Sequence, residues 1–127
     1  METTDAAARR GARAGAGGMG IRHASDQFAG TDGARLHLQA WLPGGPGSAE
    51  TTAVKAVIAV VHGYGDHGGR YSRFGEAMAA RGFAVYVYDL RGHGLSSGAR
   101  GQIRHFDEYL EDTEVFIGDV RRRQPDR

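Results

Sequence analysis

The 127-residue chain contains no cysteine, which excludes disulfides, thiolate metal sites and a cysteine nucleophile. It has no apolar run of the roughly 20 residues that cross a bilayer, and no apolar core of a secretory signal near its N-terminus. Sixteen basic and fifteen acidic residues nearly cancel, so there is no electrostatic footprint for nucleic acid. We therefore expect a cytoplasmic protein with no integral membrane segment, no nucleic-acid partner, no metal and no cofactor.

Glycine, by contrast, is abundant, with 21 residues in the chain. Residues 1–22 form an Ala/Gly/Arg-rich stretch with almost nothing to bury, which is typical of a disordered tail. Order is expected to begin near Ser25, and residues 23–127 are interpreted as one domain.

Hydrophobic spacing predicts the elements of that domain. Two short runs flank Thr31–Gly33, a turn signal, and the second run alternates apolar and polar residues, as a half-buried strand does. The continuous apolar runs 56–61 and 83–88 indicate buried parallel strands. A helix is expected over 71–81, closed by Gly82, with an apolar face formed by Phe74, Ala77 and Met78.

A second helix is expected after a loop over 91–104. One apolar stripe at helical spacing defines it: Phe106, Tyr109, Leu110, Thr113, Phe116, Ile117 and Val120. The order hairpin, strand, helix, strand, helix predicts an α/β fold, a doubly wound sheet with an antiparallel lead-in.

Two short motifs suggest different chemistries. Gly63, Gly65 and Gly68 form a G-x-G-x-x-G after a strand, and Asp89 ends the next strand, which together resemble a dinucleotide-binding fingerprint. Against this, the loop extends past the glycines before a helix can begin. This alternative, an NAD(P)-binding oxidoreductase half, predicts cofactor binding.

The second motif is a G-x-S-x-G around Ser96. A nucleophile elbow places its serine on a tight turn between a buried strand and a helix. Here the strand ends at Asp89 and no helix follows at once, so Ser96 is interpreted as a loop residue.

The two loops together carry a more specific signal. His62-Gly63-Tyr64-Gly65-Asp66-His67 continues to Arg70-Tyr71, and Asp89-Leu90-Arg91-Gly92-His93-Gly94 continues to Gly98. In this order the loops resemble those of α/β-hydrolases of the monoacylglycerol lipase and lysophospholipase group, also described as serine aminopeptidase-like. Asp66 is a departure, because glutamate is common there. The resemblance covers about 26–126.

This resemblance implies the first part of an α/β-hydrolase fold with an incomplete sheet, in which strand 56–61 has an unpaired outer edge. It implies hydrolysis of a lipid ester by a serine nucleophile, with the Tyr64 backbone N–H as one oxyanion donor. The Tyr64 side chain would line the acyl site. The supporting loop residues would be His62, Gly63, Gly65, His67, Asp89, Gly92 and His93.

The serine, acid and histidine of the family's triad have no counterpart in this sequence. We therefore expect the chain to be inactive and poorly stable alone. A third hypothesis is a non-catalytic module that a partner chain completes through the exposed sheet edge.

Overall fold

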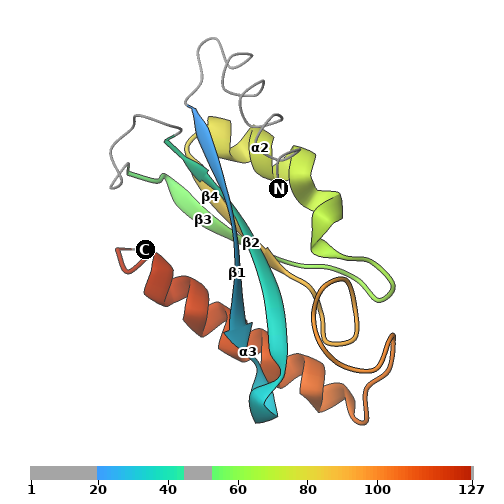
Figure 1. Ribbon diagram of the computed structural model, residues 1–127. Coiled ribbons are helices and arrows are strands. Elements are labelled where there is room, and N and C mark those ends of the chain that lie inside the picture. Colours follow the sequence, from blue (N-terminus) through green and yellow to red (C-terminus); the bar gives the residue numbers. More distant parts are fainter. Residues whose placement is uncertain (1–19, 45–52, 127) are drawn as a thin grey trace.

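The computed structural model describes residues 20–44 and 53–126 and has one four-stranded sheet between two helices (Figure 1). The strands lie in the order β1-β2-β4-β3. The predicted α/β organisation, an antiparallel hairpin followed by two parallel strands with flanking helices, is confirmed.

The lead-in hairpin consists of β1 (Ile21–Ala29) and β2 (Arg35–Pro43), joined by a 3-10 turn over Thr31–Gly33. The first strand begins at Ile21, before the predicted Ser25, because it pairs along its whole length with β2. The predicted tail over 1–22 lies outside the described residues except for its last three.

The central strand β4 (Phe83–Tyr88) pairs antiparallel with β2 and parallel with β3 (Ala56–Val61). Only β4 is buried on both faces, as its continuous apolar sequence predicts. β3 was also expected to be covered on both faces, but its residues are only partly buried or exposed. The reason is its place at the edge, where among the described residues only β4 pairs with it.

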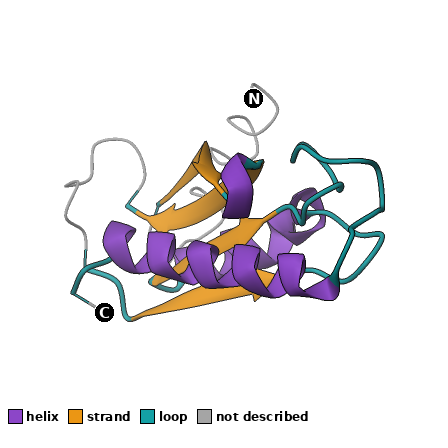
Figure 2. Ribbon diagram, turned by 90° about the horizontal axis from the view of Figure 1, so that it is seen from below, coloured by secondary structure: helices purple, strands orange, loops and turns teal. Residues whose placement is uncertain are grey.

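Each helix covers one face of the sheet (Figure 2). Because side chains alternate across a strand, Tyr86 and Tyr88 of β4 pack toward α3 (Phe106–Arg123), against Phe116 and Val120. Val85 and Val87 face α2 instead. The lead-in strand adds its alternating residues to the same α3-side core: Leu36, Leu38 and Ala40.

Helix α2 (Ser72–Ala80) follows a 3-10 turn over Gly68–Tyr71 and ends at Gly82, whose φ of +98° suits glycine. The predicted apolar face of this helix is confirmed for Met78, which packs against the core, but wrong for Phe74 and Ala77. Phe74 is exposed, whereas the buried residues are Gly75 and Ala79. Small residues face inward because the Trp41 indole occupies the space between helix and sheet.

The predicted stripe of α3 is confirmed for Tyr109, Phe116, Ile117 and Val120, which lie in or against the core, and wrong for Phe106 and Leu110. Phe106 and Leu110 are 66% and 54% exposed, and the buried positions are Glu108, Asp112, Phe116 and Val120, spaced by four. The first half of the buried face is thus polar, because a fully buried carboxylate there meets an arginine from the loop after β4.

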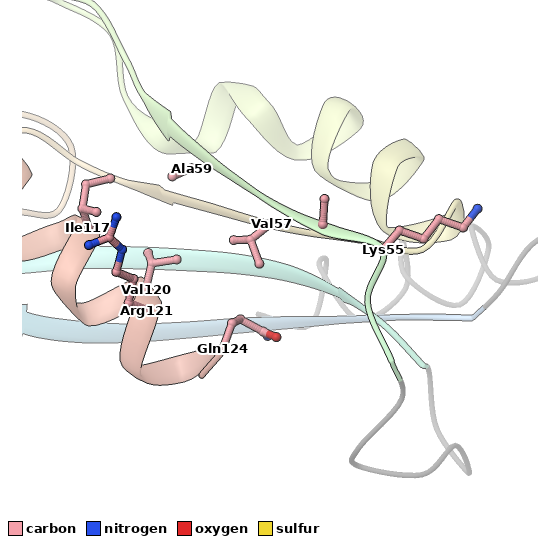
Figure 3. A pocket seen from close by; sticks show the side chains of 8 residues that line it. Lys55, Val57, Ala59, Ile117, Val120, Arg121 and Gln124 are labelled. Carbon is pink, nitrogen blue, oxygen red and sulfur yellow. The ribbon is translucent and has the colours of Figure 1, made fainter. Parts of the chain in front are cut away.

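A groove of about 400 Å³ runs between β3 and the C-terminal half of α3 (Figure 3). The side chains of Val57, Ile117 and Val120 form its apolar part, and Arg121 and Gln124 lie on the helix side. None of its lining residues belongs to the two loops after β3 and β4.

Across residues 20–44 and 53–126, no helix is both long enough and apolar enough to cross a membrane. The cytoplasmic location stays a prediction.

Candidate functional site

The two glycine-rich loops lie side by side at one end of the sheet. β3 and β4 are parallel and end in register, with Val61 opposite Tyr88, so the segments starting at His62 and Asp89 leave the sheet together. Figure 2 shows the long loops gathered at this end. Ligands of open α/β sheets bind at the carboxyl ends of parallel strands, and we take this end as the candidate site.

Two buried histidines connect the loops reciprocally. His62 Nε2 accepts a hydrogen bond from the Leu90 backbone N–H at 2.9 Å, and His93 Nε2 accepts one from the Gly65 N–H at 2.9 Å. An Nε2 that accepts carries no proton, so in each neutral ring the proton is on Nδ1. These protons point to carbonyl oxygens, Gly63 O at 2.8 Å for His62 and Arg91 O at 3.0 Å for His93.

Asp89 bridges the loops with its buried carboxylate. Oδ1 accepts from Gly68 N–H at 2.6 Å and Oδ2 from Leu95 N–H at 2.9 Å. Both oxygens are therefore committed to loop amides, which lowers the cost of burying the charge. A ribose hydroxyl would have to displace these bonds, so the geometry does not support the dinucleotide-binding alternative. Helix α2 also begins only at Ser72, beyond the glycine motif.

Tyr64 lies at the tip of the first loop and is 73% exposed. Its phenol donates a hydrogen bond to Gly101 O at 2.8 Å, and its ring meets His93 edge-on with centroids 5.2 Å apart. Gly65, the next residue, has a φ of +83° that favours glycine. Among the described residues we find no hydrogen-bond acceptor for the Tyr64 backbone N–H.

The peptide group that carries this N–H is held through its carbonyl. Gly63 O accepts from His62 Nδ1 at 2.8 Å and from the Asp66 N–H at 3.0 Å. Gly63 has open space where a side chain would be, so its backbone faces outward. The peptide between Gly63 and Tyr64 is thus held at its carbonyl, while its N–H has no acceptor among the described residues.

His67 and Asp66 shape the exit of the loop. His67 Nδ1 accepts from the Gly69 N–H at 3.1 Å, which caps the 3-10 turn. Asp66 accepts from the His67 N–H at 2.8 Å, and that hydrogen bond, together with the nearby Arg70, lowers the pKa of the Asp66 carboxyl. His67 is exposed and, among the described residues, its hydrogen bonds stay within the first loop, unlike those of His62 and His93.

Ser96, of the G-x-S-x-G motif, is 3% exposed. Its hydroxyl donates to Asp89 O at 2.5 Å and accepts from the His37 N–H at 2.9 Å. Ser97 continues the pairing with Arg35 of β2, so this stretch of loop follows the sheet edge. The Ser96 hydroxyl is occupied by backbone groups and has no histidine partner, and its role in the described structure is that of a loop anchor.

A buried ion pair that the sequence analysis missed supports the second loop. Asp112 of α3 is fully buried and binds Arg91 with both oxygens, each at 3.0 Å. Asp112 Oδ1 also accepts from Thr31 N–H at 2.9 Å, in the hairpin turn. The hydrogen bonds to Asp112 raise the pKa of Arg91. The sequence signal was a carboxylate four residues before Phe116, which places it on the same face of the helix as that buried ring.

The remaining glycine of the predicted set, Gly92, closes the second loop on itself. It has a φ of +77°; its N–H donates to Ser97 O at 2.8 Å and its carbonyl accepts from Gly101 N–H at 2.8 Å. A side chain there would overlap the Ala99 carbonyl. In the described part of the chain, no group of three or more His, Asp or Glu side chains is arranged to hold a metal ion.

Comparison with known proteins finds relatives of this chain in sequence and in fold. The sequence profile of the family described as serine aminopeptidase, S33 matches residues 52–127. A monoacylglycerol lipase of Mycolicibacterium smegmatis is 36% identical over 91 residues, which is 72% of this chain and 30% of that protein. A phospholipase of Bacillus subtilis is 38% identical over 66 residues, 52% of this chain and 26% of its own length.

A soluble variant of monoglyceride lipase from Saccharomyces cerevisiae has a similar fold. Its structure superposes with a TM-score of 0.55 at 22% identity, over 76% of this chain and 29% of that one. The matched part of this chain spans 30% of the length of the Mycolicibacterium smegmatis lipase and 26% of the Bacillus subtilis phospholipase.

Proposed function

Because the chain belongs to the serine aminopeptidase S33 family of α/β-hydrolases, we propose that it contributes one half of the oxyanion site of a lipid ester hydrolase. The donor is the backbone N–H of Tyr64, in the loop after β3. In this fold one oxyanion donor comes from that loop, and the other follows the nucleophile.

One observation carries the proposal: the Gly63–Tyr64 peptide. Its carbonyl accepts two hydrogen bonds, while its N–H has no acceptor among the described residues. A preorganised donor of this kind stabilises the charge that develops on the carbonyl oxygen during acyl transfer, and it costs little reorganisation.

The covalent chemistry is not assigned to any residue of this chain. Ser96 is buried and hydrogen-bonded to backbone groups, and the family's nucleophile, acid and histidine match no position here. We expect the 127-residue chain alone to hydrolyse no ester. In a complete hydrolase, attack of a serine on the ester would release the alcohol and leave an acyl-enzyme for water to cleave.

The substrate class is a carboxylic ester of a lipid, such as a monoacylglycerol or a lysophospholipid. This rests on the names of the relatives, a monoacylglycerol lipase and a phospholipase. The exposed Tyr64 ring beside His93 offers an aromatic surface for the start of an acyl chain. Its phenol is engaged with Gly101, so the hydroxyl is not available to bind the substrate.

The test is a chimera in which this chain replaces the aligned segment of the Mycolicibacterium smegmatis lipase. We expect the chimera to hydrolyse a monoacylglycerol and to react with a serine-directed fluorophosphonate at the nucleophile of the acceptor protein. A monoacylglycerol, a lysophospholipid and a matched amide separate the substrate classes. A folded chimera that reacts with the fluorophosphonate but hydrolyses none of them would refute the proposal.

A further inference from the structure

His62 has a geometry that acts on the donor peptide itself. Its Nδ1 proton bonds Gly63 O at 2.8 Å, and this oxygen belongs to the same peptide group as the Tyr64 N–H. In a trans peptide the carbonyl and the N–H point in opposite directions. Holding the carbonyl from one side therefore aims the N–H toward the other.

The orientation of His62 is set by the second loop. Its Nε2 accepts the Leu90 N–H at 2.9 Å, which requires the proton to be on Nδ1. The ring is buried, and it packs beside His93 with centroids 5.5 Å apart. The backbone of the loop after β4 thus determines which His62 nitrogen donates, and the donor then determines the direction of the Gly63–Tyr64 peptide.

We propose that His62 is a positioning residue for the oxyanion donor, acting through the Gly63 carbonyl; this rests on the proposed function of Tyr64. A second hydrogen bond, from the Asp66 N–H at 3.0 Å, reaches the same oxygen. Hydrogen bonds to a carbonyl polarise the whole amide and strengthen its N–H as a donor. His62 therefore both aims and polarises the Tyr64 N–H.

Tyr64 provides a second restraint on the same segment. Its phenol is tied to Gly101 at 2.8 Å, and the following amide, Gly65 N–H, is tied to His93 at 2.9 Å. With the preceding carbonyl, the side chain and the following amide all held, rotation about the Tyr64 backbone bonds is restricted. Of the side chains that hold this segment, His62 is the one that bonds the Gly63–Tyr64 peptide itself.

Two substitutions of His62 each keep one of its two hydrogen bonds, to Gly63 O or from the Leu90 N–H, and remove the other. His62→Asn places an amide N–H near the position of Nδ1 and keeps a donor for Gly63 O. His62→Gln places an amide oxygen near Nε2 and keeps an acceptor for Leu90 N–H. A role limited to joining the loops predicts that Gln retains more activity, whereas the positioning role predicts that Asn does.

The experiment measures kcat and KM for a monoacylglycerol in the chimera. We expect His62→Phe and His62→Gln to lower kcat by about 10- to 100-fold, a part of the loss seen when an oxyanion donor is removed, with KM within about threefold. His62→Asn should stay within about threefold of the parent in kcat, as should the control His105→Asn, an exposed histidine at the start of α3. Equal loss for Asn and Gln, or a loss expressed mainly in KM, would overturn the inference.

A measurement on the 15N-labelled 127-residue chain is independent of catalysis. We expect a scalar coupling across the hydrogen bond between the Leu90 amide nitrogen and His62 Nε2. We also expect the ring proton of His62 to be on Nδ1. Finding the proton on Nε2 in the folded chain would overturn the inference. If the parent chimera is inactive while this coupling is present, the proposed function fails and the His62 geometry stands.

Discussion

Gly75 of α2 lies directly against the Trp41 indole of β2: a Cβ added to Gly75 would lie 2.7 Å from Trp41 Cγ and closer to other ring atoms. This contact sets the distance between α2 and the sheet, and α2 in turn follows the loop that carries Tyr64. A glycine inside a helix normally costs about 1 kcal/mol relative to alanine, so its presence here reflects the need for close approach.

Gly75→Ala should therefore lower the free energy of unfolding by about 1–3 kcal/mol, because the overlap with the indole outweighs the gain in helix propensity. The matched control is Gly118→Ala in α3, where the nearest atom to an added Cβ is the mobile end of Arg122 at 3.8 Å. That substitution should stabilise the chain by up to about 1 kcal/mol. Urea unfolding followed by circular dichroism measures both, and a stabilising Gly75→Ala would contradict the packing described.

Removing the carboxylate of Asp112 should destabilise the fold far more than removing that of Asp32, the second and more exposed partner of Arg91. Asp112→Asn leaves the largely buried Arg91 with only the half-exposed Asp32 as a charge partner, and breaking a buried pair costs about 3–5 kcal/mol. Asp32→Asn removes a pair 3.4 Å from Arg91 whose carboxylate is 50% exposed, so we expect less than about 1 kcal/mol. Similar losses for both variants in thermal unfolding would argue against a buried ion pair.

Ser96→Ala should affect stability and not chemistry. The hydroxyl bridges His37 N–H and Asp89 O, and losing it leaves two buried backbone groups unpaired, at a cost of about 1–3 kcal/mol. The purified 127-residue chain should show no turnover of a p-nitrophenyl ester and no fluorophosphonate labelling. Labelling at Ser96 in the parent, lost in Ser96→Ala, would contradict this account and assign a nucleophile to this loop.

The chain should lose stability at alkaline pH through Tyr88. Burial raises the pKa of Tyr88 from 10.0 to about 12, although its hydrogen bond with Thr113 opposes the shift. A raised folded-state pKa means that the stability is fully present below pH 10 and is lost as pH rises toward 12, by roughly 3 kcal/mol in total. Tyr88→Phe should flatten this part of the pH profile. Unfolding midpoints at several alkaline pH values test it, and an unchanged profile would contradict it.

Much of the fold follows from local sequence pattern. The alternation of Leu36, Leu38 and Ala40 and the apolar run of β4 predict strands correctly, because the pattern records which strand faces the helices cover: one face of β2 and both faces of β4. The helix faces were predicted less well. Phe106 and Leu110 fit an apolar stripe but lie outside, because Asp112 turns inward to meet Arg91, a partner 21 residues away. Periodicity carries no information about such a distant ion pair.

The candidate site was likewise predicted only in part from the sequence. The two loop motifs identify the end of the sheet where they meet. The hydrogen bonds that join them depend on three-dimensional register: His62 to Leu90 and His93 to Gly65 each cross 28 positions. The hydrogen bond from the Tyr64 phenol to Gly101 O was not predicted, because only the folded path of the second loop brings that carbonyl within reach.

The central claim is that the Tyr64 backbone N–H is an oxyanion donor, and the most direct test removes that hydrogen alone. In the chimera, Tyr64→Pro deletes the N–H, while Tyr64→Ala deletes the side chain and keeps the N–H. We predict that Tyr64→Pro lowers kcat for a monoacylglycerol by about 10²–10³-fold, well beyond the loss in Tyr64→Ala, with both variants folded by circular dichroism. A Tyr64→Pro chimera that retains the kcat of Tyr64→Ala would contradict the claim.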